Sequence, residues 1–369
     1  MDCSKTVAKS ETPIKILIGG SPCTKWSIAQ KNGREVLPEG IGWELFENYR
    51  IAKEKFQPNF FLYENNKSAA QPIKDAIYSA LGGGKDSSVR LTHINSALVS
   101  AQHRQRFYVT NFGDIEQPED RGILLRDVLE SGEDLSCREK AYTLTASYGG
   151  AVAWNTLERN QRTMVAEPIR IGTIESNAKN KSHDSKQYRV YSPDGKATTL
   201  CGQGGGVGAK TGLYAVLING VHKEFPVYEV RDEFITIKDK QYPIKLRDGY
   251  YIIRKLTPTE CERLQTMPDG YTAAVSNGQR YKALGNGWTA EVIIHILNHA
   301  LKDIPRDEEL VVLSMYDGIA TGRYCLDKMG FTNVIKYYAY EIDPYAQKIA
   351  MSNYPDIVQC GDAFQIRNF

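Results

Sequence analysis

The last 60 residues restrict the possible folds more than any other part of the chain. Three short apolar strands alternate there with two helices: strands are expected at residues 311–316, 334–340 and 357–360, and helices begin at residues 323 and 344. The first strand leads into the glycine turn Asp317–Gly322, the second ends at Glu341 and the third at Asp362. This pattern predicts a βαβαβ half of a parallel nucleotide-binding sheet, in which glycines let a ligand approach the backbone and an acid takes a ribose diol.

The N-terminal region shows the same alternation of strand and helix. Residues 14–18 form a short apolar run, residues 41–55 have helical spacing, and residues 60–63 are the next candidate for a buried strand. Such alternation favours an α/β fold with a parallel sheet. From about residue 137 to 253 the sequence changes to short strand-like runs separated by Gly, Asn, Asp and Pro, without a convincing amphipathic helix. This texture predicts a β-rich insertion.

Helices return after the insertion. Thr257–Glu260 is a capping box with Pro258 at the first helical position, and apolar residues at helical spacing follow Thr289. At ~100–200 residues per domain, a chain of 369 residues has room for two domains or for one large domain with an insertion. We expect three segments, at residues 1–136, 137–275 and 276–369.

Composition narrows the class of protein. With 41% apolar residues, 24% charged residues and a mean hydropathy of −0.42, the chain is expected to be globular rather than disordered or fibrous. The net charge of +2 is unevenly distributed: residues 137–255 carry 19 Lys/Arg and 12 Asp/Glu (+7), residues 307–369 carry 5 and 9 (−4), and the rest sums to −1. A basic central segment therefore precedes an acidic one.

Cysteine usage and apolar runs indicate the compartment. The seven cysteines are odd in number and form no CxxC pair, which argues against a disulfide framework and favours a reducing, intracellular setting. No apolar stretch approaches ~20 residues and the first twelve residues lack the core of a signal peptide, so neither secretion nor a membrane span is expected. His295 and His299 have the spacing of a zinc pair but no HExxH glutamate, so no metal site is predicted.

Three short motifs carry residues that can do chemistry. Cys23 follows the first strand, where α/β proteins place reactive groups, and is either a nucleophile or a small buried residue. Glu64 follows the second strand and is either a carboxylate that holds a proton or a helix cap. Arg104 and Arg106 alternate along an extended segment, where they either clamp phosphate or a polar ring edge, or belong to a solvated basic strand.

Together these motifs resemble those of the cytosine-5 DNA methyltransferases, over almost the whole chain. Gly19–Cys23 looks like the nucleophile motif of that family, Glu64–Asn66 like its acidic motif and Gln102–Arg106 like its QxRxR motif. Further similar segments are the brace of the target-recognition domain at Arg254–Asp269, the cofactor-pocket motif at Gly285–Trp288, and the three S-adenosylmethionine motifs at Tyr316–Gly322, Glu341 and Asp362. Ser21-Pro22-Cys23 with Trp288 is closest to the animal de novo type, while Thr24 and Asn66 depart from the family's usual glutamine and valine.

The resemblance implies a fold. It is an S-adenosylmethionine-dependent, Rossmann-like α/β fold: a mixed sheet with helices on both faces, plus an inserted β-rich target-recognition domain. Residues 1–136 and 276–369 would be the two parts of the catalytic domain, and residues 137–275 the recognition domain with its brace. The cofactor motifs normally come first in this family and here come last, which implies a circular permutation. The cut would lie between the strand ending at Asp362 and the strand leading to Cys23, with the termini on one edge of the fold.

The resemblance also implies a mechanism. Cys23 would add to carbon 6 of a cytosine flipped out of the duplex, Glu64 would bond ring nitrogen 3 and the exocyclic amine, and Arg106, with Arg104, would hold the ring carbonyl and a flanking phosphate. Carbon 5 would receive the methyl group of S-adenosyl-L-methionine, leaving S-adenosyl-L-homocysteine. The residues implied to bind the cofactor are Pro22, Asn286, Trp288, Tyr316, Asp317, Gly318, Ile319, Ala320, Thr321, Gly322, Glu341, Ile342, Asp362 and Ala363.

The expected substrate is double-stranded DNA, read in the major groove by the basic insertion. We expect a sequence-specific enzyme of restriction-modification, solitary or phage type, with a cognate restriction endonuclease as a candidate partner. We further expect a monomer in the cytoplasm of a bacterial or phage-infected cell, associated with the nucleoid.

Three alternatives agree less well with the sequence. A tRNA cytosine-5 methyltransferase would have a shorter insertion. A catalytically silent DNA-binding paralogue would have no need to keep Cys23, Glu64, Arg104 and Arg106. A dinucleotide-dependent dehydrogenase would need a GxGxxG turn, which Gly318–Gly322 does not match.

Overall fold

The structure is a computed structural model, which describes residues 12–27, 32–130, 133–134, 138–168, 170–173, 189–191, 213–214, 227–237, 239–244, 246–332 and 335–368. The chain divides into two compact units. The first comprises Met1–Ile123, Thr143–Gly149 and Cys261–Phe369, and the second comprises Leu124–Tyr142 and Gly150–Glu260. The predicted functional boundaries after residues 136 and 275 stay a prediction.

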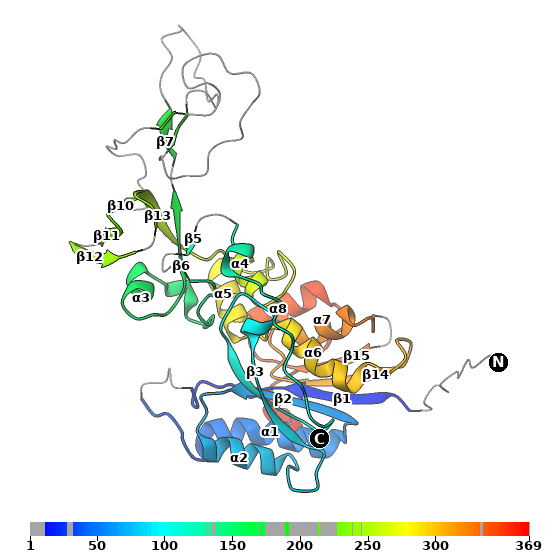
Figure 1. Cartoon of the computed structure of the whole chain (residues 1–369). Helices are drawn as coiled ribbons and strands as arrows, with labels where there is room; N and C mark the ends of the chain where they lie inside the picture. The colour runs from blue at the N-terminus through cyan, green and yellow to red at the C-terminus, as the bar shows by residue number, and fades with distance from the viewer. Residues whose placement is uncertain are drawn as a thin grey trace, which may run out of the picture. The chain divides into compact units, whose positions relative to one another are not determined.

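A seven-stranded sheet with the order β16-β15-β14-β1-β2-β4-β3 organises the first unit (Figure 1). All strands are parallel except β4, which runs antiparallel to both of its neighbours. The strands are β1 (Ile14–Gly19), β2 (Phe60–Asn66), β3 (Arg90–Asn95), β4 (Gln105–Thr110), β14 (Leu310–Met315), β15 (Ile335–Tyr340) and β16 (Val358–Gly361). The chain thus enters the sheet in the middle, builds one half, and returns beside β1 to build the other. The predicted α/β fold with a mixed sheet is confirmed.

Helices cover both faces of this sheet. In Figure 1, α1 and α2 lie on one side of it, and α6 and α7 lie on the other. The helices are α1 (Gly40–Phe56), α2 (Gln71–Ala80), α4 (Pro258–Leu264, which begins in the second unit), α5 (Asn277–Asn286), α6 (Ala290–Leu301), α7 (Thr321–Lys328) and α8 (Pro344–Asn353), with short 3-10 helices η1 (Ser96–Leu98), η3 (Tyr148–Gly150) and η5 (Ala363–Asn368).

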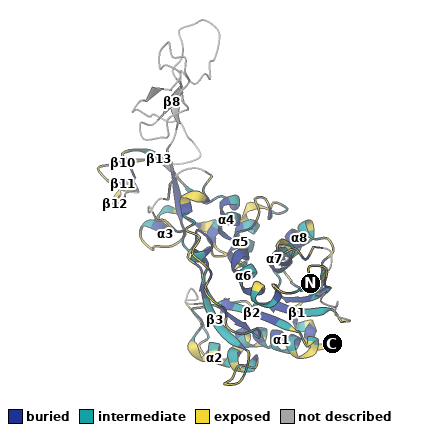
Figure 2. Cartoon of the chain, turned by 45° about the vertical axis from the view of Figure 1, so that its right-hand side comes forward, coloured by how far each residue is buried: buried dark blue, intermediate teal, exposed yellow. Residues whose placement is uncertain are grey.

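The core follows from the alternation of side chains along the strands. Leu17, Phe61 and Leu313 pack in one cluster with residues of α1 and α2. Ile18, the neighbour of Leu17, points to the other face, where it lies against Gly322 of α7. Figure 2 shows the resulting band of buried residues along the central strands.

Two predicted helix starts are confirmed in atomic detail. At the start of α4, the Thr257 N–H donates to Glu260 Oε2 at 2.7 Å and the Glu260 N–H donates to Thr257 Oγ1 at 3.1 Å, which is a complete capping box. At the start of α8, Asp343 Oδ1 accepts the N–H of Tyr345 at 2.9 Å. Both caps satisfy backbone donors that a helix terminus leaves without partners.

The second unit is built from short strands, as predicted. A six-stranded sheet has the order β12-β11-β10-β13-β6-β5 and is antiparallel throughout, and a three-stranded sheet has the order β7-β8-β9. Its elements are η2 (Leu125–Asp127), β5 (Glu133–Asp134), α3 (Ala153–Leu157), β6 (Met164–Pro168), β7 (Arg170–Thr173), β8 (Arg189–Tyr191), β9 (Leu213–Tyr214), β10 (Val227–Arg231), β11 (Phe234–Ile237), β12 (Lys240–Pro243) and β13 (Gly249–Lys255). Its helix α3 has five residues, too few to show helical periodicity, and so does not conflict with the expected lack of a convincing amphipathic helix.

Candidate active site

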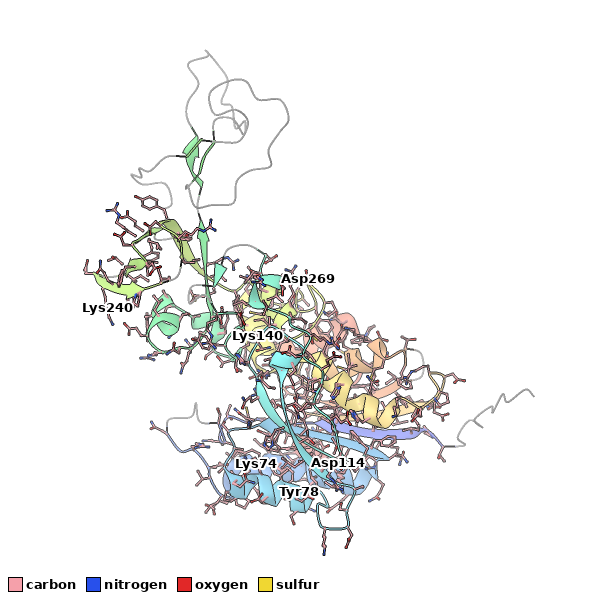
Figure 3. All side chains as sticks on the ribbon, viewed as in Figure 1. Lys74, Tyr78, Asp114, Lys140, Lys240 and Asp269 are labelled. Atoms are coloured by element: carbon pink, nitrogen blue, oxygen red, sulfur yellow. The ribbon has the colours of Figure 1, made fainter. Side chains whose placement is uncertain are left out.

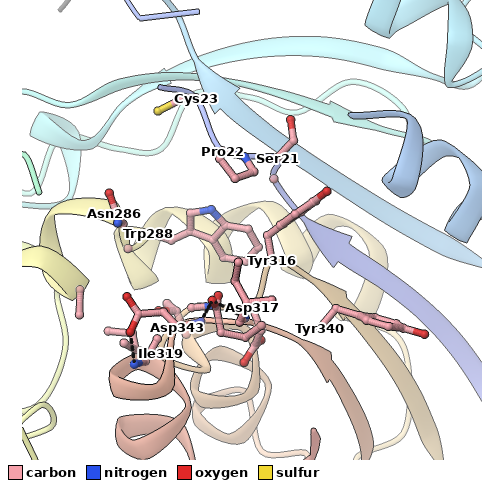
Figure 4. Close-up of a pocket in the computed structure, with 18 of the residues that line it drawn as sticks. Ser21, Pro22, Cys23, Asn286, Trp288, Tyr316, Asp317, Ile319, Tyr340 and Asp343 are labelled. Atoms are coloured by element: carbon pink, nitrogen blue, oxygen red, sulfur yellow. Dashed lines mark hydrogen bonds between the residues drawn. The ribbon is translucent and has the colours of Figure 1, made fainter. Parts of the chain in front are cut away.

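The carboxyl ends of the parallel strands open into a cavity of about 440 Å³ in the first unit (Figure 4). This is the place and size of a typical ligand site in an α/β fold. Of the eighteen predicted site residues, all but Ala320 and Gly322 line it. Those that line it are Pro22, Cys23, Glu64, Arg104, Arg106, Asn286, Trp288, Tyr316, Asp317, Gly318, Ile319, Thr321, Glu341, Ile342, Asp362 and Ala363.

Ala320 and Gly322 shape the glycine turn rather than the cavity wall. Ala320 is fully buried and takes a left-handed φ of 62° immediately before α7. A Cβ on Gly322 would lie 2.2 Å from Ile18 Cδ1, so glycine is needed for α7 to pack this closely on β1. Ala320 and Gly322 set the course of the backbone in this turn, so that its other residues face the cavity.

A buried hydrogen-bond network holds the loop that carries Cys23. Ser21 Oγ and the Tyr63 hydroxyl are 2.7 Å apart. The Asn65 side-chain amide donates to the Ser21 carbonyl at 2.9 Å and to the Tyr63 hydroxyl at 3.1 Å. Because all three side chains are buried, the network fixes the loop against β2 without help from solvent.

The Cys23 thiol lies in a mixed electrostatic environment. Burial raises the pKa of the thiol above its ordinary value. The positive charges of Arg106 and Arg104 lower this pKa, and the charge of Glu64 raises it, but burial outweighs the arginines. The resting group is therefore a neutral thiol at pH 7. Cys23 is partly buried and lines the cavity, so it is more than a small core residue.

A salt bridge and a hydrogen bond fix the carboxylate of Glu64. Arg106 Nε lies 2.9 Å from Oε1, and both side chains are only 12% exposed. The Trp288 indole N–H donates to Oε2 at 3.1 Å. A Cβ on Gly20 would lie 2.4 Å from the Glu64 carbonyl, so glycine lets the Cys23 loop pass directly beside this residue.

The strand that carries Glu64 is longer than predicted. The sequence suggested an end at Tyr63, whereas β2 continues through Asn66 because β4 pairs with it, with Glu64 opposite Tyr108. Glu64 therefore projects from a paired strand, and the helix-cap interpretation is wrong because the residue at the N-cap of α2 is Ala70.

Arg104 differs from Arg106 in what it contacts. Its guanidinium is 3% exposed and donates to the carbonyls of Leu144, Gly285 and Gly287, the last at 2.6 Å. Burial, followed by the charge of Arg106, lowers the pKa of Arg104 to about 9. The interpretation of a solvated basic strand is wrong for this residue, which braces the loop ending at Gly287.

The other half of the cavity is formed by the ends of β14, β15 and β16. Glu341 Oε2 accepts the Gly318 N–H at 2.9 Å, and Oε1 accepts the N–H groups of Ile342 and Asp343 at 2.8 and 2.7 Å. Tyr316 donates from its hydroxyl to the Leu45 carbonyl at 2.8 Å. These bonds tie the glycine turn to the next strand and to α1.

Asp317 is the most perturbed acid of this half. Its Oδ1 accepts the Tyr337 hydroxyl at 2.7 Å, whereas Oδ2 is buried and has no hydrogen-bond partner within the described residues. Burial raises the pKa of the Asp317 carboxyl to about 6. An unpaired buried oxygen of this kind is expected to attract a cationic donor.

Helix α5 contributes residues to the cavity that the sequence motifs did not indicate. Gln279, Lys282 and Ala283 line the cavity together with Asn286, and Lys282 Nζ forms a salt bridge of 2.7 Å with Asp343. Their positions follow a helical spacing of three, four and seven residues, which places them on one face. Counting back from Asn286 along a helix would have found them.

A family model described as C-5 cytosine-specific DNA methylase matches residues 2–302. The chain belongs to this family. It is a DNA (cytosine-5) methyltransferase, and the family predicted from the motifs is confirmed. Membership implies S-adenosylmethionine-dependent chemistry and a DNA substrate.

Individual relatives have low sequence identity to the methylase, but the similarity extends over most of each chain. The orphan methyltransferase M.SPRI of Bacillus phage SPR is 22% identical over 377 residues, covering 81% of this chain and 85% of the relative. The type II methyltransferase M.HhaI of Haemophilus parahaemolyticus is 25% identical over 311 residues, covering 78% and 75%. The solved structure of the Entamoeba histolytica methyltransferase EhMeth is similar at 13% identity and a TM-score of 0.41, covering 79% and 78%. The fold assignment rests on the strand order of the sheet itself.

The cavity of the methylase fits S-adenosylmethionine in its chemistry. Ile342 is 70% exposed on the cavity wall and offers an apolar surface for a purine. Glu341 and Asp362 follow two neighbouring strands and are acceptors for hydroxyl groups. Asp317 lines the same half of the cavity and adds a carboxyl group to it.

The described part of the methylase contains neither a metal-binding cluster nor a membrane-spanning helix. No group of three His, Cys, Asp or Glu side chains there could hold a metal ion. His295 Nε2 lies 2.8 Å from the Glu116 carbonyl, and His299 Nδ1 lies 3.0 Å from the His295 carbonyl. No helix among the described residues has the length and apolar character needed to cross a membrane.

Proposed function

We propose that this methylase transfers a methyl group from S-adenosylmethionine to carbon 5 of a cytosine in duplex DNA, with the cavity as its active site. One observation carries the proposal: Cys23, Glu64 and Arg106 line the same cavity as the glycine turn and the acids that follow β15 and β16. A nucleophile, a charged pair able to hold a base, and a nucleotide-type pocket thus share one space.

In the proposed reaction, Cys23 compensates for the poor nucleophilicity of carbon 5. The Cys23 thiol first gives its proton to solvent. The thiolate then attacks carbon 6 and forms an S–C6 bond, and the electron pair of the C5–C6 double bond moves toward carbon 5. A proton taken up from solvent is shared between Glu64 and ring nitrogen 3. Glu64 also accepts from the exocyclic amine, and Arg106 donates to the ring carbonyl, which together stabilise the charge that develops on the ring. Carbon 5 accepts the methyl group, with S-adenosylhomocysteine as the leaving group. Water then removes the carbon 5 proton, and the electron pair of the C5–H bond re-forms the C5–C6 double bond while the S–C6 bond breaks and releases the thiolate.

The cofactor is proposed to occupy the half of the cavity at the ends of β14, β15 and β16. When bound, it supplies an electrophilic methyl group on a positively charged sulfur. Glu341 would take the ribose hydroxyls, Ile342 the purine face and Asp317 the amino group. The remaining contacts are proposed for Pro22, Asn286, Trp288, Tyr316, Gly318, Ile319, Thr321, Asp362 and Ala363, with Ala320 and Gly322 shaping the turn.

Carbon 6 of a stacked cytosine is inaccessible, so the base must leave the helix before Cys23 can attack it. Unstacking costs a few kcal/mol. The Glu64 and Arg106 side chains are already paired at 2.9 Å in the wall of the cavity, which supports a preformed base site.

Residues 137–275, which include most of the second unit and the brace at Arg254–Asp269, are proposed as the target-recognition domain. Residues 137–255 carry a net charge of +7, which favours contact with phosphates. Arg159 lies 4.2 Å from the ring centre of exposed Trp154, and Arg138 lies 4.4 Å from that of Tyr142. Lys240, at the start of β12, also lies on this unit, where it forms a salt bridge of 2.8 Å with Glu158 (Figure 3).

A circular permutation of the family's motif order is also proposed. Both ends of the described chain contact one turn of α1: Lys15 Nζ donates to the Phe56 carbonyl at 3.3 Å, and Lys55 Nζ donates to the Arg367 carbonyl at 3.2 Å. The family match stops at residue 302, before β14, β15 and β16. Ends that lie this close support a chain opened at a new point in an otherwise unchanged fold.

The biological setting is proposed from the relatives, which include orphan phage and type II methyltransferases. We propose a sequence-specific enzyme of restriction-modification, solitary or phage type, acting as a monomer at the nucleoid in the bacterial cytoplasm. A cognate restriction endonuclease would be its partner in the first case.

The proposal is tested by incubating the protein with tritiated S-adenosylmethionine and duplex DNA of mixed sequence. The expected result is label at carbon 5 of cytosine, within a recurring sequence that bisulfite sequencing of DNA from expressing cells would identify. Binding of the cofactor without transfer to any DNA would contradict the proposal, and transfer to tRNA alone would replace DNA as the substrate.

A further inference from the structure

Trp288 connects the two halves of the cavity. Its side chain lines the cavity, and its indole N–H donates to Glu64 Oε2 at 3.1 Å. Figure 4 shows the ring between the Pro22–Cys23 loop on one side and Asp317 and Ile319 on the other, with the indole nitrogen toward the loop. The residue is therefore both wall of the cofactor pocket and partner of the carboxylate proposed to bind the base.

The backbone around Trp288 is held by buried side chains on both flanks. The carbonyl before it, on Gly287, accepts Arg104 Nη2 at 2.6 Å. The residue after it, Thr289, donates from its hydroxyl to Gln265 Oε1 at 2.9 Å and lies 2.9 Å from Ser96 Oγ. An indole on a support this rigid holds its partner in one orientation, which is what a preorganised site requires.

The two partners of Glu64 divide its oxygens between them. Arg106 engages Oε1 and Trp288 engages Oε2, so the carboxylate cannot rotate without losing both bonds. Arg106 is itself proposed to contact the base, whereas among the described residues the indole N–H donates to Glu64. Trp288 thus acts on the reaction through Glu64.

We propose that Trp288 is a positioning residue for Glu64: its indole N–H orients the carboxylate for the flipped base. This inference rests on the proposed function of Glu64 and adds a role for a residue whose resemblance-based role is to line the cofactor pocket. It separates the two tasks of one side chain, since the ring surface forms the pocket wall and the N–H serves the base.

Trp288→Phe removes the N–H and keeps an aromatic wall. We expect the maximal rate of methyl transfer to fall about 10- to 100-fold, the range for losing a hydrogen bond to a charged group, while the KM for the cofactor and its affinity by calorimetry change less than about threefold. Trp43→Phe, on α1 and outside the cavity, is the matched control and should leave the rate within about twofold.

A double-mutant cycle with Glu64→Gln tests whether Trp288 acts through Glu64. Rates of covalent trapping on 5-fluorocytosine DNA are compared for the wild type, both single variants and the double variant. If the proposal holds, Trp288→Phe slows the wild type but not Glu64→Gln. Equal slowing in both backgrounds, or a Trp288→Phe rate within about twofold of wild type, would overturn it.

The Glu64→Gln variant and an analogue of tryptophan distinguish failure of this inference from failure of the proposed function or of folding. If Glu64→Gln is itself fully active, the proposed function of Glu64 fails rather than the inference about Trp288 alone. If Trp288→Phe does not fold, 3-benzothienylalanine at position 288 replaces the N–H by sulfur with almost no change of shape. The proposal then predicts the same loss of rate with unchanged cofactor affinity, and an unchanged rate would overturn it.

Discussion

Arg106 on β4 and Glu64 on β2 form a salt bridge of 2.9 Å at the edge of the cavity, although β4 is the one antiparallel strand of the sheet. The antiparallel direction matters, because it brings the beginning of β4 beside the end of β2, with Arg106 opposite Asn66. A parallel strand would have carried this arginine to the opposite edge of the sheet.

Arg106→Lys is expected to lower the rate of methyl transfer about 100-fold. Lysine keeps the charge but lacks the planar fork that can engage Glu64 and a ring carbonyl together. Single-turnover kinetics measure the effect. The control is Arg90→Lys, because Arg90 forms a similar bridge of 2.9 Å with Asp114 outside the cavity. Similar rates for both variants would argue against a role of Arg106 at the base.

Cys23→Ala is expected to abolish methyl transfer and the covalent adduct on 5-fluorocytosine DNA, because no other group supplies the proposed S–C6 bond. Cofactor affinity should remain within about threefold of wild type. Denaturing gels report the adduct and calorimetry reports the affinity. Cys360→Ala serves as control for a half-exposed thiol away from the cavity. A partly active Cys23→Ala variant would contradict covalent catalysis.

The rate of adduct formation is expected to rise with pH from 7 toward 9. Burial raises the pKa of the Cys23 thiol, so at pH 7 only a small fraction is the reactive thiolate, and this fraction grows about tenfold per pH unit below the pKa. Trapping rates on 5-fluorocytosine DNA give the profile. A rate independent of pH over this range would show that the thiol is already ionised or that another step is limiting.

Arg104→Lys is expected to destabilise the protein by about 2 kcal/mol. A lysine ammonium cannot reach all the carbonyls that the guanidinium bonds, which leaves buried acceptors without partners. Urea unfolding measures the change. Arg50→Lys, on the surface of α1, should cost less than about 0.5 kcal/mol. Equal effects would mean that the buried bonds contribute nothing specific.

Asp317→Asn is expected to stabilise the cofactor-free protein at pH 7 and to weaken cofactor binding. The pKa of Asp317 is raised to about 6, so the folded state favours the protonated acid; this stability is present below the pKa of the unfolded chain and is lost as the pH rises through about 6. The ionised form costs up to about 3 kcal/mol. The difference in melting temperature between wild type and variant should therefore grow from pH 4 to 7. A constant difference would contradict the assignment.

Much of the fold was accessible from the sequence because local signals agreed with the final structure. The strands and helices of the last 60 residues, the capping box at Thr257 and the Asp343 cap all depend on neighbours in the chain. The length of β2 could not be predicted from local signals, because its last residues form a strand only by pairing with β4.

The candidate site was predictable as a set of residues but not as a set of contacts. Cys23 and Glu64 could be placed at strand ends, which share one edge of a parallel sheet. The different surroundings of Arg104 and Arg106 could not be foreseen, because Leu144 and Gly285, which accept from Arg104, come from distant parts of the chain. The bond from Trp288 to Glu64 likewise joins residues that no local pattern relates.

The entry of the chain at the middle of the sheet has a consequence for its synthesis. Ile14 on β1 pairs with Leu310 on β14, which leaves the ribosome about 300 residues later. At translation rates of 5–20 residues per second, one hydrogen-bonding edge of β1 stays without its partner strand β14 for roughly 15–60 s. A nascent chain would therefore present a bare strand edge until its last segment arrives, and we expect it to need protection from edge-to-edge association during that interval.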